Sequence, residues 1–298
     1  MHRLALICLL PTLARPQTLP QILSRLSEEA ETFYKAAPRI VSQETLTQRA
    51  RKPAPRFHPR IGADALKPPP PAYQTREIVS EYSYGTLAGA PESIHEFRQV
   101  TSVDGRPIAS PKAARHALAL NLTSNDDRAK KRMLENFQKY GLTEAAVDFG
   151  PLLLLFTKHQ LVNYTYALSG DSRIGADAVK IVSYTQTAGP ARLLVFQGHR
   201  AIHQRVQGRI YARVPDGLPL RISVVESRAG GKTVLRDEAT VDYTLNAQGY
   251  LAPAAVTHRA YSGGQLMVED DFRYAAFRKF GADAAIKFDT LPVTPPPQ

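Results

Sequence analysis

The chain has 298 residues, of which 43% are hydrophobic and 22% charged, and its formal net charge is +11. This composition excludes an intrinsically disordered chain, because enough apolar side chains are present to fill a sizeable core. The only cysteine, Cys8, excludes a fold stapled by disulfides within the chain, and the excess of cations raises the question of an anionic partner.

The first fourteen residues have the pattern of a secretory signal peptide. A short basic start, His2 and Arg3, precedes an apolar run, Leu4 to Leu13, which ends at the small residue Ala14. A buried first strand or helix is the alternative. We therefore expect residues 1–14 to be removed and the mature chain to be periplasmic or secreted. No later stretch is predicted to cross a membrane.

An amphipathic helix is predicted over Leu19 to Ala37, where apolar residues recur at three- and four-residue steps. Arg39 to Arg49 alternates more weakly, as a strand. Lys52 to Ala72 ends in four consecutive prolines, and so many missing amide donors predict an extended loop, the Pro-rich basic loop 52–72.

The basic region around this loop, residues 49–76, holds seven cations against one acid. For an exported protein it indicates an anionic envelope surface, such as lipid headgroups, as a partner, with a merely solvated loop as the alternative. A nucleic-acid partner is not predicted, because such an interface needs a folded basic stripe with aromatic platforms or a recognition helix.

Two strands, Arg76 to Leu87 and Glu92 to Val103, are rich in residues of high β-propensity. A helical insertion, residues 110–158, follows them. Its first helix begins at the Ser110-Pro111 capping pair, and a second helix runs from Ser124 to Gly141. An apolar run comes last, and we expect it to act as a lid through Leu152, Leu155 and Phe156.

The remainder of the chain predicts strands, at residues 160–168, 178–185 and 193–196 and then in a meander from Gly208 to Phe272. The predicted fold class is α+β, a curved antiparallel sheet wrapped on the N-terminal helix and the helical insertion. One face of the meander is apolar and is the candidate ligand-binding concavity, formed by Ile210, Ile222, Val224, Val241, Tyr243, Leu266, Val268 and Phe272.

The sequence predicts no catalytic residue, no metal site and no cofactor. Glu269, Asp270 and Asp271 alternate within a strand, and paired carboxylates can perform acid/base chemistry. A solvated strand face answered by Arg259 or Arg273 is the simpler interpretation. A carboxylate-dependent hydrolase would instead show a polar pocket around a carboxylate with a strongly shifted pKa.

The order of elements, together with the stretch from Gly208 to Ile222, resembles the periplasmic outer-membrane lipoprotein carrier (LolA/LolB-like) superfamily. There a glycine leads into a strand, a short turn, and a second strand with a Pro-x-Arg-like step, here Pro219 to Arg221. The resemblance implies a half-open barrel whose apolar concave side holds acyl chains. It also implies an early-strand arginine that latches the lid, and both Arg76 and Arg98 fit that role.

We therefore expect a single carrier-like domain over residues 15–288, followed by a Pro-rich tail, 289–298. Its predicted function is non-enzymatic binding of a hydrophobic or lipid-like ligand in the concavity. The alternative is a structural or sensory interaction module of the envelope whose sheet is filled by its own helices. Available volume separates the two, because a concave face packed by Leu152 to Phe156 has no room for acyl chains.

Overall fold

The computed structural model describes residues 17–53, 70–123, 127–190, 193–197, 200–230 and 233–279. The predicted signal peptide, residues 1–14, and the predicted tail, residues 289–298, lie outside the described residues. Residues 54–69, most of the predicted Pro-rich basic loop, lie outside them as well.

Helices are few and short relative to the strands. They are α1 (Leu19–Ala36), η1 (Ala37–Arg39), α2 (Pro111–Thr123), α3 (Asp127–Lys139), η3 (Gly150–Phe156) and η4 (Leu161–Asn163), where η denotes a 3-10 helix. The strands are β1 (Ile40–Arg51), β2 (Tyr73–Leu87), β3 (Ala90–Val103), β4 (Arg106–Pro107), β5 (Tyr164–Ile174), β6 (Asp177–Gln186), β7 (Leu193–Gln197), β8 (Arg200–Gln204), β9 (Gln207–Arg213), β10 (Pro219–Gly230), β11 (Thr233–Leu245), β12 (Leu251–Ser262) and β13 (Gln265–Lys279).

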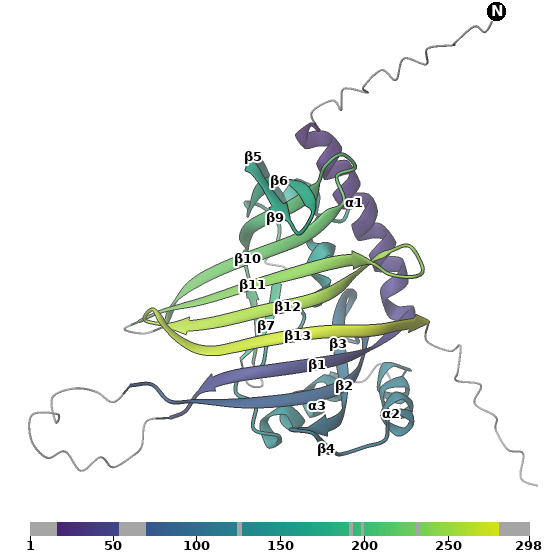
Figure 1. The fold of residues 1–298 in the computed structure, drawn as a ribbon, viewed down its shortest axis with the longest axis vertical. Coiled ribbons are helices and arrows are strands. Elements are labelled where there is room, and N and C mark those ends of the chain that lie inside the picture. Colours follow the sequence, from purple (N-terminus) through teal and green to yellow (C-terminus); the bar gives the residue numbers. More distant parts are fainter. Residues whose placement is uncertain are drawn as a thin grey trace, which may run out of the picture.

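One curved antiparallel sheet dominates the molecule (Figure 1), as the sequence predicts. Its eleven strands follow the order β4-β3-β2-β1-β13-β12-β11-β10-β9-β6-β5, and β7 and β8 pair separately. The last strand, β13, therefore pairs with the first, β1, over a long antiparallel register. The sheet stays open, because β4 and β5 have no strand partner on their outer sides among the described residues.

The inner face of the sheet is the face that α1 and η3 cover. Alternation along the strands turns Ile210, Ile222 and Val241 toward it, and the α1 stripe of Ile22, Leu26 and Phe33 is fully buried in the same core. At the start of α1 the Thr18 amide donates to Gln21 Oε1 at 2.9 Å, which satisfies one of the free amides of the first turn.

The helical insertion covers both faces of the sheet. Helix α2 lies on the outer face, where Leu118 packs against Val41 and Phe97 in a small core of its own. Helix α3 lies at the β3 edge, and its C-terminal half joins the main core, together with η3, through Met133, Leu134 and Phe137. Two of the three parts of the insertion therefore close an edge and an outer surface.

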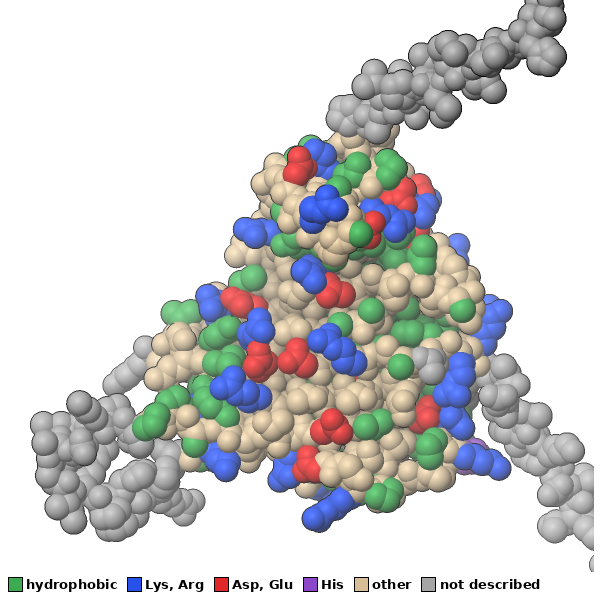
Figure 2. Space-filling model, viewed as in Figure 1, with side chains coloured by type: hydrophobic (Ala, Val, Ile, Leu, Met, Phe, Trp, Pro, Cys, Tyr) green, Lys and Arg blue, Asp and Glu red, His purple; other side chains and the backbone are tan. Residues whose placement is uncertain are grey.

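The outer face of β10–β13 is polar. Neighbouring strands pair opposite charges across it, as in Arg221 with Asp242 and Arg259 with Glu269. Figure 2 shows this face, with Lys and Arg side chains interspersed among Asp and Glu. The sheet thus has one apolar and one solvated face, as an antiparallel sheet commonly does.

Candidate functional site

A continuous apolar row crosses the inner face through eight strands, from β6 to β2. Each residue is the register partner of the next, and none is more than 1% exposed. The row consists of Val182, Ile210, Ile222, Val241, Val256, Phe272, Leu46 and Ile78. It contains four of the predicted concavity residues, and three others, Val224, Tyr243 and Val268, are buried on the same face, while Leu266 is half-buried near the strand end.

The predicted lid residues lie on this face as well. Leu152 and Phe156 in η3 are at most 1% exposed and Leu155 is 8% exposed. The Phe156 ring packs edge-on against Tyr184, with ring centroids 4.9 Å apart, and lies 5.5 Å from the Tyr164 ring. In this state the protein's own side chains fill the space over the apolar row.

A buried carboxylate holds the chain immediately before this packing. Glu96 on β3 accepts hydrogen bonds from the amides of Asp148 at 2.6 Å and Gly150 at 2.9 Å. A Cβ on Gly150 would collide with Glu96 Oε1 and the Tyr82 hydroxyl, so only glycine allows this approach.

Arg98 balances that carboxylate. Its guanidinium donates to Glu96 Oε2 at 2.8 Å and to Glu44 Oε1 at 2.7 Å, and the three side chains are almost completely buried. Burial raises the pKa of Glu44, and Arg98 offsets only part of this, while the two carboxylates outweigh burial and raise the pKa of Arg98.

The two arginines that fit the latch role are placed very differently. Arg98 is joined through Glu96 to the backbone of residues 148 and 150. Arg76 is 41% exposed and pairs with Asp104 in the turn between β3 and β4.

A second polar cluster holds residues 143–146. Asp270 on β13 accepts from the Ala146 amide at 2.9 Å and from Gln48 Nε2 at 2.7 Å. Gln48 in turn accepts from the Thr143 amide and donates to the Thr143 carbonyl. Residues 143–150, which we call the anchored segment, are therefore tied to the sheet by side chains from β1, β3 and β13.

His258 lies behind Asp270, with Nδ1 at 3.1 Å from Asp270 and Nε2 at 3.2 Å from Asp237. Burial alone would lower the pKa of His258, but the two carboxylates outweigh it and raise the pKa to about 9. The imidazolium is therefore the form that this site favours at neutral pH. Phe149 of the anchored segment stacks on the same ring, with centroids 5.2 Å apart.

On the edge of β3 that faces away from β2, side chains form hydrogen bonds with the backbone of Glu96. Asp148 Oδ1 accepts from the Glu96 amide at 2.6 Å, and Lys130 of α3 donates to the Glu96 carbonyl at 2.6 Å. Lys130 also pairs with Asp148, which in turn contacts His95 at 3.0 Å. Burial opposes the charge on Asp148, yet Lys130 and His95 lower its pKa below the ordinary value. This closure replaces a neighbouring strand.

Beyond Gly150, residues 151–156 are held in a different way. Among the described residues, Leu153 is the one member of 151–156 that hydrogen bonds to the sheet, through its amide and the Tyr243 hydroxyl at 3.0 Å. Tyr243 donates to the Gly150 carbonyl at 2.9 Å. The remaining contacts of η3 with the sheet and with α1 are apolar packing.

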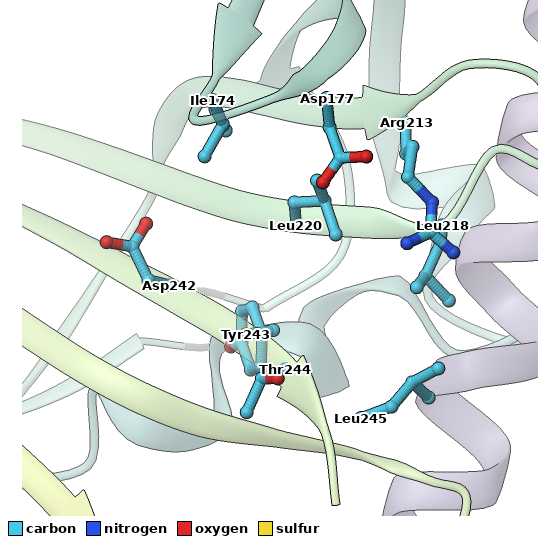
Figure 3. Close-up of a pocket in the computed structure, with 9 residues that line it drawn as sticks. All are labelled: Ile174, Asp177, Arg213, Leu218, Leu220, Asp242, Tyr243, Thr244 and Leu245. Carbon is cyan, nitrogen blue, oxygen red and sulfur yellow. The ribbon is translucent and has the colours of Figure 1, made fainter.

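An open cavity of about 360 Å³ lies beside Tyr243 (Figure 3). Ile174 and Asp177, at the turn between β5 and β6, lie over Leu220 on β10 and the end of β11. The other lining residues are Arg213, Leu218, Asp242, Thr244 and Leu245. Tyr243 is the predicted site residue that both lines this cavity and contacts the lid.

The three acidic residues of β13 are separated by the pleat. Asp270 points inward with no exposed surface, and Glu269 and Asp271 point outward, where Glu269 pairs with Arg259 and Asp271 accepts from Thr257. Within the described residues no group of three or more His, Cys, Asp or Glu side chains is arranged to hold a metal ion.

Sequence reasoning missed the polar side of the site, namely Glu44, Gln48, Glu96, His258 and Asp270 acting on the inner face. Glu44 and Gln48 alternate with Leu46 on β1, so the only signal was a strand whose inward positions carry polar residues. A buried carboxylate requires a partner, but the sequence does not show that the partner is the backbone of residues 143–150.

Comparison of the sequence with models of known families and with curated proteins finds no match. Two solved structures are similar to the chain, each with 8% identity and a TM-score of 0.33. One is a LolA superfamily protein from Nitrosomonas europaea, covering 87% of this chain and 93% of that chain. The other is a DUF1329 family protein from Desulfovibrio piger, covering 89% and 94%.

Both likenesses concern the fold alone. No helix in the described part of the chain is long and apolar enough to cross a membrane.

Proposed function

We propose that the protein binds an apolar, lipid-like molecule on the inner face, at the apolar row that η3 covers. This proposal rests on a difference in how two parts of the covering chain, residues 143–150 and residues 151–156, are held on the sheet. Three side chains of the sheet, Gln48, Glu96 and Asp270, hold the anchored segment by hydrogen bonds. Residues 151–156 are held by packing and one hydrogen bond. An apolar ligand can replace packing, but it cannot replace hydrogen bonds to buried carboxylates.

The cavity beside Tyr243 is the entry we assign to such a ligand. Its volume lies at the lower end of the range of about 300–1,000 Å³ that is usual for small-molecule sites. Leu218, Leu220 and Leu245 provide apolar surface there. A ligand in this cavity contacts Tyr243, whose hydroxyl holds η3, so that ligand entry and lid release act on one side chain.

The test uses a fluorescent long-chain fatty acid as probe with the purified full chain. We expect saturable binding, weakened by Leu220→Asp, because a carboxylate placed among the cavity leucines is costly to desolvate. Val162→Asp is the matched control, since Val162 lies outside the site and is 79% exposed. Equal loss of binding in both variants, with both still folded, would contradict the proposed entry.

The lid itself is tested with the apolar dye ANS. Phe156→Asp weakens closure, so dye fluorescence should rise while the circular dichroism of the sheet is retained. Leu155→Asp should act in the same direction but more weakly, because Leu155 already retains some exposure.

The alternative function is an interaction module with a permanently filled core, and the complete burial of Phe156 and Leu153 favours it. It predicts that Phe156→Asp unfolds the protein cooperatively and that the wild-type chain binds no fatty acid. Native mass spectrometry of protein purified from its own cells, examined for co-purified lipid, separates the two functions independently of any variant.

Export and an anionic surface contact through residues 49–76 complete the proposal. The amino-acid pattern of residues 1–14 supports export. Mass analysis of protein recovered from the cell envelope should then show an N-terminus near Arg15. Recovery of chains that retain Met1 would contradict it.

A further inference from the structure

We propose that the end of the molecule formed by α2, α3 and β4 docks onto a bilayer surface that contains anionic phospholipids. These elements lie together at one end, at the bottom of Figure 1. The proposed surface is formed by residues other than those of the basic loop, and it does not depend on ligand binding at the inner face.

Two apolar side chains are exposed at this end. Ile108, between β4 and α2, is 50% exposed, and Leu120 on α2 is 56% exposed. Leu120 follows Lys112 and His116 at four-residue steps, so the three form one solvent-facing stripe. The opposite stripe of α2, with Ala114 and Leu118, is buried against the sheet. Leu120 is thus turned away from the core and is available to insert into another phase.

The helices at this end also expose cations. Helix α3 exposes Arg128, Lys131, Arg132 and Lys139. Among the described residues no carboxylate lies within ion-pair distance of Lys112, Lys131 or Lys139. On the outer face of the sheet, by contrast, Arg221 and Arg259 are each paired with a carboxylate on a neighbouring strand. Helices α2 and α3 therefore present cations whose charge no carboxylate of the described residues offsets at ion-pair distance.

Exposed aliphatic side chains together with cations favour a lipid surface over other polyanions. Cationic side chains beside exposed aliphatic ones are typical of helices that lie in a membrane interface, where the aliphatic groups enter the acyl boundary and the cations meet the headgroups. A single-stranded nucleic acid would use aromatic platforms. The large apolar residues exposed at this end, Ile108 and Leu120, are both aliphatic.

The experiment is co-sedimentation of the full chain with vesicles of phosphatidylcholine alone and of phosphatidylcholine mixed with phosphatidylglycerol. We expect binding to the mixed vesicles, weakening as salt is raised. The double variant Lys131→Glu/Lys139→Glu should lower partitioning by about twenty-five-fold or more, because each of the two cations near an anionic surface contributes a factor of about five. Ile108→Ser/Leu120→Ser should lower it without changing the salt dependence.

Two matched controls make the test specific to this end. Val162→Ser/Val234→Ser removes exposed apolar residues elsewhere, 79% and 59% exposed, and Arg209→Glu/Arg273→Glu reverses two cations on the sheet. Thermal unfolding establishes that every variant is folded. If the controls lower binding as much as the test variants, net charge alone is responsible and the docking surface is refuted. Equal binding to DNA and to anionic vesicles, with equal sensitivity to the variants, would likewise overturn the assignment to lipid.

Discussion

The chain from residue 143 to residue 156 covers two regions of the inner face, and a different kind of interaction holds it on each. Under residues 143–150 the sheet presents Gln48, Glu96 and Asp270, each hydrogen bonded to the covering backbone. Under residues 151–156 it presents the apolar row and the rings of Tyr164 and Tyr184. The first region specifies one geometry, while the second provides area that any apolar partner can cover.

This difference separates a fixed part of the cover from a replaceable one. Opening the anchored segment would take away the backbone amides that Gln48, Glu96 and Asp270 bind, and a buried polar group left without its partner costs about 1–3 kcal/mol, or more when it is charged. Opening η3 beyond Gly150 sacrifices packing and the Leu153 hydrogen bond, and a ligand restores the packing. The hinge between the two regions is therefore expected at Gly150.

The largest effect is expected from Arg98→Ala. It leaves Glu44 and Glu96 buried without their cation, and removing one partner of a buried ion pair costs about 3–5 kcal/mol. Urea unfolding measures the loss of unfolding free energy. Arg76→Ala is the control, because the Arg76 pair with Asp104 is exposed and contributes about 1 kcal/mol or less. Equal losses of unfolding free energy in Arg98→Ala and Arg76→Ala would contradict the different energetic roles assigned to the two arginines.

A change of similar size in the free energy of unfolding is expected when the pH is varied, because of His258. Its pKa is raised from 6.5 to about 9 on folding, so its stabilising contribution is complete below pH 6.5 and is lost as the pH rises through 9. The difference corresponds to about 3 kcal/mol. Urea unfolding at a series of pH values should show this decline in the wild type and a flatter profile in His258→Gln. A decline of the same size in the variant would assign it to other groups.

A smaller effect is expected from Tyr243→Phe, which keeps the ring and removes the hydroxyl. The Gly150 carbonyl and Leu153 amide then lose their partner, at a cost of about 1–3 kcal/mol. The change should appear as faster amide exchange in η3, with the anchored segment unaffected. Uniformly faster exchange across both regions would show that they open as one unit.

The apolar region could be predicted from the sequence and the polar region could not. Strict alternation in β9–β11 placed Ile210, Ile222 and Val241 on one face, because that face has a single chemical character. On β1 the inward positions mix Leu46 with Glu44 and Gln48, so periodicity is weak even though all three are buried. The partner of Gln48 is the Thr143 amide, 95 residues away, and the partner of Glu44 is the Arg98 guanidinium, 54 residues away, which no local pattern shows.

Several strands extend further in the structure than the sequence predicts. The strand predicted from Arg76, for example, begins at Tyr73. Within the predicted meander, β12 begins at Leu251 and passes through Pro253, which pairs with Tyr243 on β11 alone. The register with β13 starts only at Ala255, so the missing amide of Pro253 disrupts no second ladder. A proline at the end of a strand that has one neighbour there is thus tolerated.

Residue-resolved hydrogen exchange, with and without a long-chain fatty acid, tests the central claim most directly. The amides of Ala146, Asp148 and Gly150 should remain protected in both conditions, since carboxylates of the sheet hold them. The amides of residues 152–156 should exchange faster than these in the free protein and faster still as the fatty acid displaces η3. Equal protection of the two sets, unchanged by the fatty acid, would contradict a replaceable cover and identify η3 as permanent core.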